Sequence, residues 1–381
     1  MTTLSERISQ SAFDGSRLRV VLLLDLYDGA QNQFLQVYED LRKQVSSVPG
    51  HISDELCQSI ENPSQWLITS EWESAPPFLA WLNSEEHVRS VEPLHGCVRD
   101  TRSLRFSVLQ ESGKAVVDLP LPVKGRLQTA PRRGDGLVRH ALTFTVKPGS
   151  EAVVAKLMAG YASPQAQVDE STWLRRTSLF MHGNRVVRAI EVEGDLLAAL
   201  RHVARQPEVR ALEEALNPYL EQSRDLDDPA SARVFFTRAA LPAVHHVAAA
   251  GYESEAVGRH ALFYSAKAGC GMALARLLAG QDEAAVDDLT SPVEGSTVFQ
   301  RDDVVVRLLD VRGPLDARPA LAAGVEGDRK AAVLARLLDD GDGYGSSGAE
   351  DGLLTTDLGI SRFLARSTMR RITDRRAGAE V

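Results

Sequence analysis

An internal duplication constrains the fold of this chain more than any other feature of its sequence. The stretch RHAL at 139–142 returns at 259–262. Self-similarity at a long period marks repeated structural units, so we expect two copies of one domain in series. Further matching pairs are Lys147 with Lys267, Gly149 with Gly269, Phe180 with Phe299, Arg188 with Arg307 and Gly194 with Gly313.

Each copy is predicted to alternate strands with helices. In the first copy Gly183 and Asn184 separate two β-branched, apolar runs, a pattern that favours a hairpin with a tight turn. The segment from Ser361, SRFLARSTMRR, resembles SARVFFTRAAL from Ser231, so both copies should end alike. The first copy is predicted as strand, helix, two hairpin strands, helical region and final strand, at 138–147, 150–160, 173–182, 185–192, 195–219 and 232–239.

The residues before the duplication predict a third unit of the same kind. LRVVLLLDLY at 18–27 is typical of a buried strand, and apolar residues from Phe34 to Val45 recur at helical spacing. The βαββαβ order is that of a ferredoxin-like α+β fold, with helices on one face of an antiparallel sheet. The remaining predicted elements are two strands, a helix and a strand, at 52–60, 65–73, 76–91 and 103–110.

We therefore expect a ferredoxin-like N-terminal domain of the dimeric α+β barrel type, followed by two duplicated ferredoxin-like units. The expected domains are 17–110, 136–250 and 256–381, with a Pro/Gly-containing linker at 111–135 and a flexible Gly/Ser-rich insertion at 341–357. Helices cover only one face of such a sheet, so the duplicated units should pair their other faces around an apolar pocket. The N-terminal unit should pair its face in a homodimer or against its own chain.

Composition argues against several classes of function. A net charge of -9 disfavours nucleic-acid binding, which needs clustered Lys and Arg. No apolar run reaches the ~20 residues of a membrane span, and nothing at the start marks export, so we expect a cytoplasmic protein. Cys57, Cys97 and Cys270 lack zinc-ligand spacing and should be reduced, buried thiols. The adjacent His245 and His246 point apart on any regular element, so we expect no metal site there.

The N-terminal unit carries a set of residues in a characteristic order. They are Pro49-Gly50, Asn62-Pro63, Trp66, Glu71-Trp72, Phe78, Trp81 and His87. In this order they resemble the antibiotic biosynthesis monooxygenase family. The resemblance implies that Asn62 is an oxygen-polarising amide, that Trp66 is a catalytic pocket indole, and that Trp72, Trp81 and His87 bind substrate.

The residues alone leave a plainer alternative open. Asn62-Pro63 is also a good turn, and Trp66, Trp81 and His87 could be core residues. Trp66 and Trp72 are an even number of residues apart on one strand, so both indoles should point to the same side of the sheet.

The rest of the chain resembles a more specific family. Its segments include RHALTF at 139–144, FMHGNRVVRAIEVEGDL at 180–196, DLDDP at 225–229, ALPAVHH at 240–246 and MRRITDRR at 369–376. They are similar to the SchA/CurD-like family of type II polyketide pathways for spore pigments and pentangular polyphenols. The two resemblances together imply a cofactor-independent monooxygenase that hydroxylates a polycyclic aromatic polyketide, or oxidises it to a quinone, with O2.

The sequence is compatible with chemistry that needs no cofactor. It has no GxGxxG after a strand, no Walker-type loop, no CxxCH and no HExxH. An ionised anthrone or polyphenol can itself give an electron to dioxygen. The protein then has to bind, deprotonate and shield its substrate, and to stabilise the developing oxyanion.

The duplicated half offers a rival site, in which His182 or His140 is the base and Arg188 holds a phenolate. His182 is matched by Arg301, so the second copy would have lost this site, whereas Arg188 is matched by Arg307, as a shared ion pair would be. A histidine repeated by duplication is also explained by structural hydrogen bonding. The substrate-binding candidates of this half are His140, Phe180, Asn184, Arg188 and His260.

Three other functions remain open at this point. A polyketide cyclase or aromatase would need the same kind of apolar pocket. Paired ferredoxin-like sheets can also hold haem, and the chain has nine histidines. Finally, the chain could be a non-catalytic partner of a polyketide synthase complex.

Overall fold

The computed structural model describes residues 8–13, 17–82, 84–108, 135–226, 228–249, 257–339 and 353–377. The chain forms two compact units: the N-terminal unit, Ser11–Thr129, and the duplicated body, Met1–Gln10 with Ala130–Val381. The predicted linker at 111–135 lies outside the described residues except for Asp135. The predicted insertion at 341–357 lies outside them up to residue 352.

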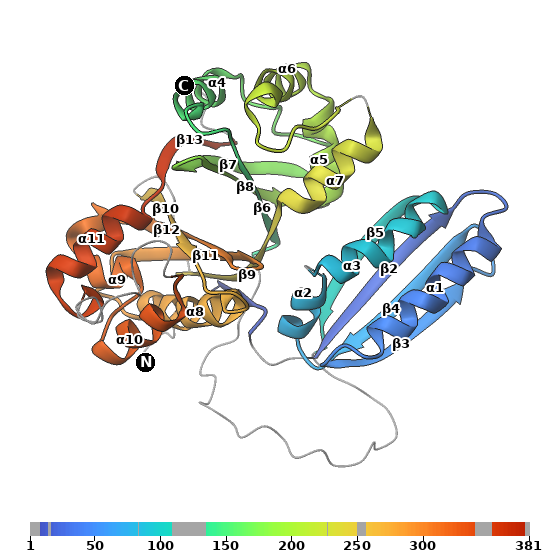
Figure 1. Ribbon diagram of the computed structural model, residues 1–381, viewed down its shortest axis with the longest axis horizontal. Helices are drawn as coiled ribbons and strands as arrows, with labels where there is room; N and C mark the ends of the chain where they lie inside the picture. The colour runs from blue at the N-terminus through green and yellow to red at the C-terminus, as the bar shows by residue number, and fades with distance from the viewer. Residues whose placement is uncertain are drawn as a thin grey trace, which may run out of the picture. The chain divides into compact units, whose positions relative to one another are not determined.

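The N-terminal unit is a four-stranded antiparallel sheet with helices on one face (Figure 1). Its strand order, β3-β4-β2-β5, and its βαββαβ chain order confirm the predicted ferredoxin-like fold. Its elements are β2 (Leu18–Leu26), α1 (Gln31–Val45), β3 (His51–Gln58), β4 (Gln65–Trp72), α2 (Ala75–Leu82), α3 (Glu85–Val91), the 3-10 helix η1 (Glu92–Gly96) and β5 (Val98–Ser107).

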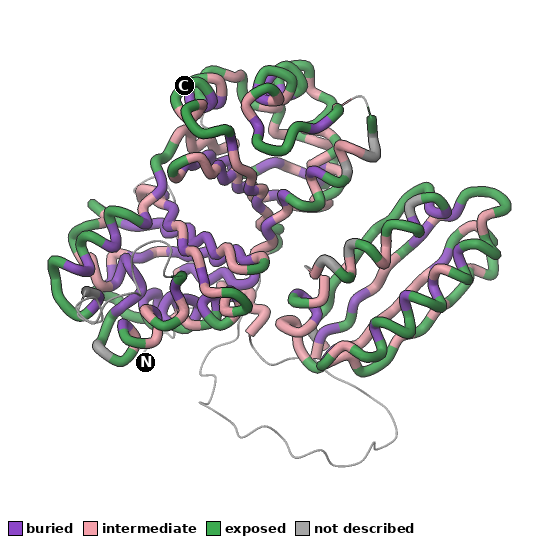
Figure 2. Tube along the Cα trace, viewed as in Figure 1, coloured by how far each residue is buried: buried purple, intermediate pink, exposed green. Residues whose placement is uncertain are grey.

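The core of this unit lies between the sheet and its helices. Figure 2 shows buried residues on the strands and on the helix sides turned toward them. The helix predicted over 76–91 is two helices, because Ser84 interrupts it. The Ser84 hydroxyl donates to the carbonyl of Trp81 and accepts from the backbone N–H of His87, which makes it the N-cap of α3. The buried residues of α1 are Phe34, Tyr38, Leu41 and Val45, at the predicted helical spacing.

The duplicated body repeats one order of elements twice. The first copy has β6 (Leu137–Thr145), α4 (Glu151–Gly160), β7 (Trp173–His182), β8 (Arg185–Glu193), α5 (Leu196–Arg205), α6 (Pro207–Leu216), η2 (Asn217–Tyr219), α7 (Pro229–Ala239) and β9 (Ala240–Ala248). The second has β10 (Gly258–Ser265), α8 (Gly271–Asp287), β11 (Val293–Arg301), β12 (Val304–Val311), η4 (Leu315–Ala317), α9 (Pro319–Ala323), α10 (Asp328–Leu337), η6 (Leu353–Thr355), α11 (Asp357–Ser367) and β13 (Arg370–Arg376).

The final strand of each copy begins later than predicted. Residues 232–239, predicted as a strand, belong to helix α7, and β9 follows them. Phe235 and Ala239 are buried and four residues apart, which is helical spacing, and reading this stretch as a strand was wrong. The matching stretch from Ser361 likewise begins in helix α11, with β13 after it.

Each final strand crosses from its own copy to the other. In β9, Ala240 pairs with Leu142 of the first copy, whereas Ala243 pairs with Phe299 of the second. After a bridge from Thr368 to β10, β13 pairs with β7 of the first copy. The sheet order β10-β12-β11-β9-β6-β8-β7-β13 therefore joins both copies in a nearly closed barrel, and Figure 1 shows the helices on its outside.

The barrel interior is packed, which corrects the expectation of an apolar pocket between the paired faces. Phe180 of the first copy and Phe299 of the second are almost fully buried in one apolar cluster. The side chains of this cluster come from strands of both copies, so the paired faces hold the copies together. Its buried members are Ala141, Phe180, Val187, Ala189, Leu241, Ala261, Phe299, Val306, Leu308 and Met369.

A short N-terminal strand completes the duplicated body. Strand β1 (Ile8–Ser11) pairs with β9, and the Gln10 side-chain amide donates to Asp135 at 3.2 Å. The chain thus contributes a strand to the duplicated body before it forms the N-terminal unit. Residues 8–11 carry no motif that predicts this pairing.

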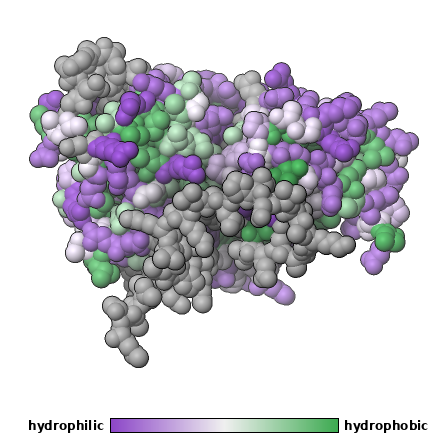
Figure 3. Space-filling view, turned by 90° about the horizontal axis from the view of Figure 1, so that it is seen from below, coloured by the Kyte–Doolittle hydropathy of each residue, from purple (hydrophilic) through white to green (hydrophobic). Residues whose placement is uncertain are grey.

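The described surface is largely polar on the face shown in Figure 3. Hydrophilic residues cover most of the face in Figure 3 that is not drawn in grey, and hydrophobic ones lie in smaller groups between them. Among the described residues, no helix has the length and apolar character needed to span a membrane. The three cysteines are free, but Cys57 is exposed, so the expectation of buried thiols was wrong there.

Candidate active site

Asn62 lies at the exposed tip of the β3–β4 hairpin. Its Oδ1 accepts from the backbone N–H of Ser64 at 3.1 Å and lies 2.9 Å from the Ser64 hydroxyl. That hydroxyl also lies 2.8 Å from Asp25, to which it can donate. The turn therefore engages the oxygen of the Asn62 amide and leaves its NH2 group as a hydrogen-bond donor.

Trp66 lies directly after this turn and is buried. Its indole N–H donates to the carbonyl of Pro63 at 3.1 Å, and its ring packs against Phe34 of α1 at 5.3 Å between centroids. The N–H is thus already used, so the indole can serve as an apolar wall and cannot also donate to a ligand in this arrangement.

A second aromatic cluster lies at the other end of β4. The Trp72 ring is fully buried, 5.6 Å from Trp81 and 5.4 Å from Phe78. Trp81 in turn contacts His87, with 4.2 Å between ring centroids. Burial lowers the pKa of His87 to about 4, and its Nδ1 is buried without a hydrogen-bond partner, so the imidazole is neutral at neutral pH.

The structure divides the predicted residues of this unit into two groups. Trp66 contacts α1 and Trp72 contacts α2, so both indoles point to the helix side of the sheet, as predicted. Six residues of extended strand nevertheless separate them by about 20 Å. Asn62 and Trp66 form one group, and Trp72, Trp81 and His87 form the other.

An open groove of about 900 Å³ runs along the edge of this unit between α1 and β3. The Tyr38 hydroxyl donates to Asp54 in its lining at 2.7 Å. Burial and this hydrogen bond both raise the pKa of Tyr38, so its phenol stays protonated. Other residues along the groove are Leu35, Gln36, Glu39, Asp40, Arg42 and Leu56.

In the duplicated body, His182 and its counterpart Arg301 occupy equivalent structural positions. Nε2 of His182 lies 2.6 Å from the carbonyl of Arg366, in the last turn of α11. Arg301 donates to the carbonyls of Arg238 and Ala240 at the end of α7. Both side chains thus form hydrogen bonds with carbonyls at the C-terminal end of a helix. A carbonyl can only accept, so the proton of a neutral His182 is on Nε2, and Nδ1 keeps its lone pair.

The other candidates of this half do not gather around His182. Arg188 forms an ion pair with Glu213 of α6 at 2.9 Å, on the helix side of the sheet. His182 lies on the barrel side, because it is two residues from the interior residue Phe180 on the same strand and so shares its face. Asn184 donates to the carbonyl of Val146 at 3.1 Å and stabilises the turn. The structure therefore does not bring His182 and Arg188 together.

His140 and His260 occupy equivalent positions on β6 and β10. Each histidine directly precedes an alanine of the interior cluster, Ala141 or Ala261, so its side chain points to the opposite face of the strand. Burial is the main cause that lowers the pKa of His260, and nearby Arg371 lowers it further. These histidines are thus separated from His182 by the sheet.

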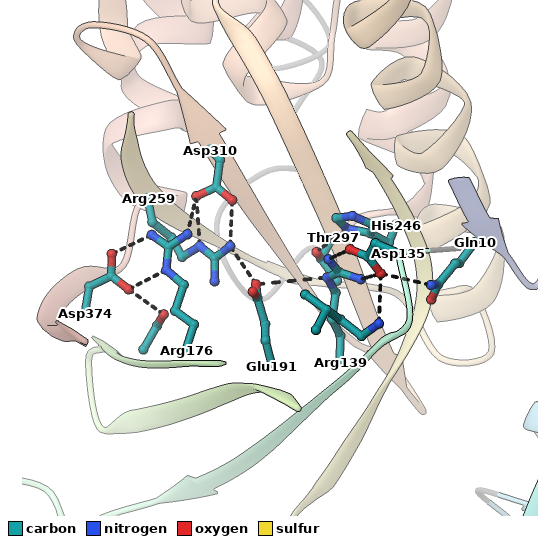
Figure 4. Close-up of polar contacts among 12 residues, drawn as sticks. Gln10, Asp135, Arg139, Arg176, Glu191, His246, Arg259, Thr297, Asp310 and Asp374 are labelled. Atoms are coloured by element: carbon teal, nitrogen blue, oxygen red, sulfur yellow. Dashed lines mark hydrogen bonds and ion pairs between the residues drawn. The ribbon is translucent and has the colours of Figure 1, made fainter. Parts of the chain in front are cut away.

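Sequence reasoning missed a buried ionic network inside the barrel (Figure 4). Arg259 contacts Asp310 through two hydrogen bonds, of 2.8 and 2.6 Å, and forms an ion pair with Glu191 at 2.7 Å. Arg176 links Asp310, at 3.3 Å, to Asp374, at 2.6 Å. The network crosses between the two copies, since Arg176 and Glu191 belong to the first and the other three to the second.

The same network continues toward the N-terminal strand. Arg139, the counterpart of Arg259, is bound to Asp135, which also accepts from Gln10. His246 lies beside it with Nδ1 2.9 Å from the Thr297 hydroxyl. Burial and the adjacent charge of Arg139 lower the pKa of His246 to about 3, so it is neutral. The repeated Arg139 and Arg259 were a usable signal, because charged residues repeated on strands rarely stay unpartnered.

The described residues contain no cluster of three or more His, Cys, Asp or Glu side chains that could hold a metal ion. His246 and its neighbour His245 contribute to no such cluster within this part of the chain.

Comparison with known proteins supports the sequence interpretation. Residues 17–93 match the family described as antibiotic biosynthesis monooxygenase, and residues 137–249 match the SchA/CurD like domain. Polyketide synthase CurD of Streptomyces cyaneus is 61% identical over 99% of both chains. The chain belongs to the SchA/CurD-like family.

Two further proteins are similar to all or part of this chain. Protein SchA of Streptomyces halstedii is 54% identical to this SchA/CurD-like protein. The alignment covers 100% of the present chain and 98% of SchA. Among solved structures, SnoaB of Streptomyces nogalater, a cofactor-independent oxygenase, aligns with 25% of this chain and 96% of its own, at 14% identity and a TM-score of 0.24.

Proposed function

We propose that this SchA/CurD-like protein is a cofactor-independent oxygenase that hydroxylates an aromatic polyketide, or oxidises it to a quinone, with O2. The match of residues 17–93 to the antibiotic biosynthesis monooxygenase family and the polyketide synthase name of its relative CurD support this class of reaction. The observation that carries the assignment to the N-terminal unit is the NH2 group of Asn62, which the turn leaves as a donor, in a turn whose Pro63 carbonyl binds the indole N–H of Trp66.

In this proposal the substrate supplies the electrons. Loss of a C–H proton from an anthrone-like ring gives a carbanion stabilised as an enolate, whose oxygen the Asn62 amide can hydrogen-bond. The carbanion gives an electron to O2, and recombination forms a C–O bond as a peroxide. Protonation and loss of water then leave a ketone, so one oxygen atom enters the product and the other leaves as water.

The hairpin turn positions the amide for this role. Ser64 fixes the oxygen of Asn62, and the same hydroxyl reaches Asp25, a carboxylate that can take up the proton from the substrate. Ser64 is a positioning residue in this scheme, because it does not itself contact the reacting atoms. The Trp66 indole is bound through its N–H to the carbonyl of Pro63, the residue after Asn62, and its ring packs against Phe34, so it supports the turn that holds the amide.

The test measures O2 consumption with 1,8-dihydroxyanthrone as the probe, after subtraction of the protein-free rate. Asn62→Ala should lower turnover about a hundredfold, the value of one oxyanion donor. It should leave the fold intact by circular dichroism, because Asn62 is exposed at a turn. Ser64→Ala should lower kcat less, and Ser64→Thr, which keeps the hydroxyl, should restore it.

A matched comparison locates the site. Full O2 consumption by both Asn62→Ala and Trp66→Phe, together with its loss in His182→Ala, would move the active site to the duplicated body. Cyclisation of a linear polyketide substrate without O2 uptake would instead favour a cyclase or aromatase.

We also propose that the protein is a homodimer joined through the N-terminal sheet. Leu23 and Phe106 are 40% and 51% exposed on the side of this sheet opposite its helices. Their exposure leaves apolar area that a second copy could cover. Sedimentation of the full chain should give a dimer and Phe106→Arg a monomer. A wild-type monomer would contradict the proposal.

A further inference from the structure

Arg185 at the start of β8 is a half-buried cation without a carboxylate partner. Among the described residues no Asp or Glu oxygen lies within ion-pair distance of its guanidinium. Its Nη1 donates to the Thr143 hydroxyl at 3.3 Å, and Glu221, the acid that influences it, is engaged by Asn184 and Thr145. Burial lowers the pKa of Arg185. A buried charge of this kind is costly unless an anion binds it.

The surroundings of Arg185 are aromatic and come from both copies. Its guanidinium lies 5.3 Å from the ring centroid of Phe263 on β10, and the His182 ring lies 5.1 Å from the same centroid. Arg185 and His182 are paired across the β7–β8 hairpin, so both project from the same face at its turn. All three side chains are partly exposed, so a molecule in solution can reach them.

The duplication shows that this group is not a requirement of the fold. The register of the two hairpins makes Val304 the counterpart of Arg185 and Arg301 the counterpart of His182. Arg301 already satisfies helix carbonyls, as His182 does, so helix capping explains that pair. Nothing equivalent explains Arg185, since its counterpart Val304 has no charge and no hydrogen-bonding group.

We propose that Arg185, His182 and Phe263 form a binding site at this end of the barrel for a flat aromatic molecule that carries an anionic oxygen. The guanidinium binds the oxygen through its free N–H groups, and the ring stacks against Phe263 and His182. Nδ1 of His182 can accept a hydrogen bond from a neighbouring hydroxyl of the ligand. The site lies in the duplicated body, so it goes beyond the oxygenase function proposed for the N-terminal unit and does not depend on it.

The experiment measures binding of 2-naphthoate to the full-length protein by isothermal titration calorimetry. The neutral alcohol 2-naphthalenemethanol has the same rings without the charge and should bind at least tenfold more weakly. Arg185→Val, which copies the residue of the second hairpin, should raise the Kd for 2-naphthoate by about ten- to a hundredfold, as loss of a charge-assisted hydrogen bond predicts. Arg185→Lys should keep part of the affinity, because it retains the charge without the planar fork.

Arg175→Gln is the matched control. It removes a positive charge from the same hairpin, where Arg175 forms an exposed ion pair with Glu193, and should leave the Kd within twofold. Phe263→Leu should weaken the binding of 2-naphthoate more than that of the non-aromatic cyclohexanecarboxylate. This variant tests the proposal if Arg185→Val fails to fold. The proposal is overturned if wild type does not bind 2-naphthoate at millimolar concentration, if Arg185→Val or Phe263→Leu binds it as wild type does, or if Arg175→Gln loses as much affinity as Arg185→Val.

Discussion

Replacing Arg259 by methionine should destabilise the duplicated body by about 3–5 kcal/mol. The Arg259 side chain is 5% exposed and contacts both Asp310 and Glu191. Methionine fills a similar volume but removes the guanidinium shared by these two carboxylates, which leaves Arg176 at 3.3 Å from Asp310 and Arg139 at 4.0 Å from Glu191. The loss arises from leaving buried charges without compensation, which costs more than the ion pair itself contributes.

Differential scanning calorimetry of the full chain measures this effect. The two compact units should unfold in separate transitions, so the transition of the N-terminal unit serves as an internal reference. Arg175→Met removes an exposed ion pair with Glu193 and should cost less than about 1 kcal/mol. If Arg259→Met also costs less than about 1 kcal/mol, the network does not hold the two copies together and the reasoning is refuted.

Two further predictions concern the pH dependence of stability and the backbone. His87 takes up a proton near its ordinary pKa of 6.5 in the unfolded state but only at about 4 in the folded state. The free energy of unfolding of the N-terminal unit should therefore fall by at most about 3 kcal/mol as the pH is lowered from 6.5 to 4. His87→Gln should remove this pH dependence. An NMR titration that gives the His87 imidazole a pKa near 6.5 in the folded protein would contradict the prediction. Gly194 and Gly313 both have positive φ, but a Cβ at Gly194 would lie 2.5 Å from the carbonyl of Ser171, whereas Gly313 has open space. Gly194→Ala should therefore lower the melting temperature of the duplicated body clearly more than Gly313→Ala, and equal shifts would show that only backbone strain matters.

The repeated sequence was enough to predict that the chain contains two copies of one unit. Spacing of apolar residues predicted α1, and turn residues at Gly183 and Asn184 predicted the first hairpin. The exchange of β9 and β13 between copies could not be predicted in this way. The exchange depends on which edge strand is nearest in space. The strand around Ala243 has the same alternation of inward and outward side chains whichever strand it pairs with, so its sequence does not identify its partner.

The candidate sites were less predictable than the fold. The resemblance named Asn62 and Trp66, but only the structure shows that the turn uses the oxygen of Asn62 and leaves its NH2 group free. No motif in the sequence marks Arg185, because its counterpart is Val304 and a single arginine on a strand usually has an acidic partner. That no described carboxylate forms an ion pair with it follows from the three-dimensional arrangement.

The most direct test of the proposed oxidation is labelling with 18O2. Protein freed of metal and flavin by dialysis against chelator is given 1,8-dihydroxyanthrone, and the ketone product is analysed by mass spectrometry. The account predicts protein-dependent formation of a quinone that contains one labelled oxygen atom, and its loss in Asn62→Ala. A product that carries oxygen from water, or turnover that requires an added flavin, iron or haem, would contradict the account.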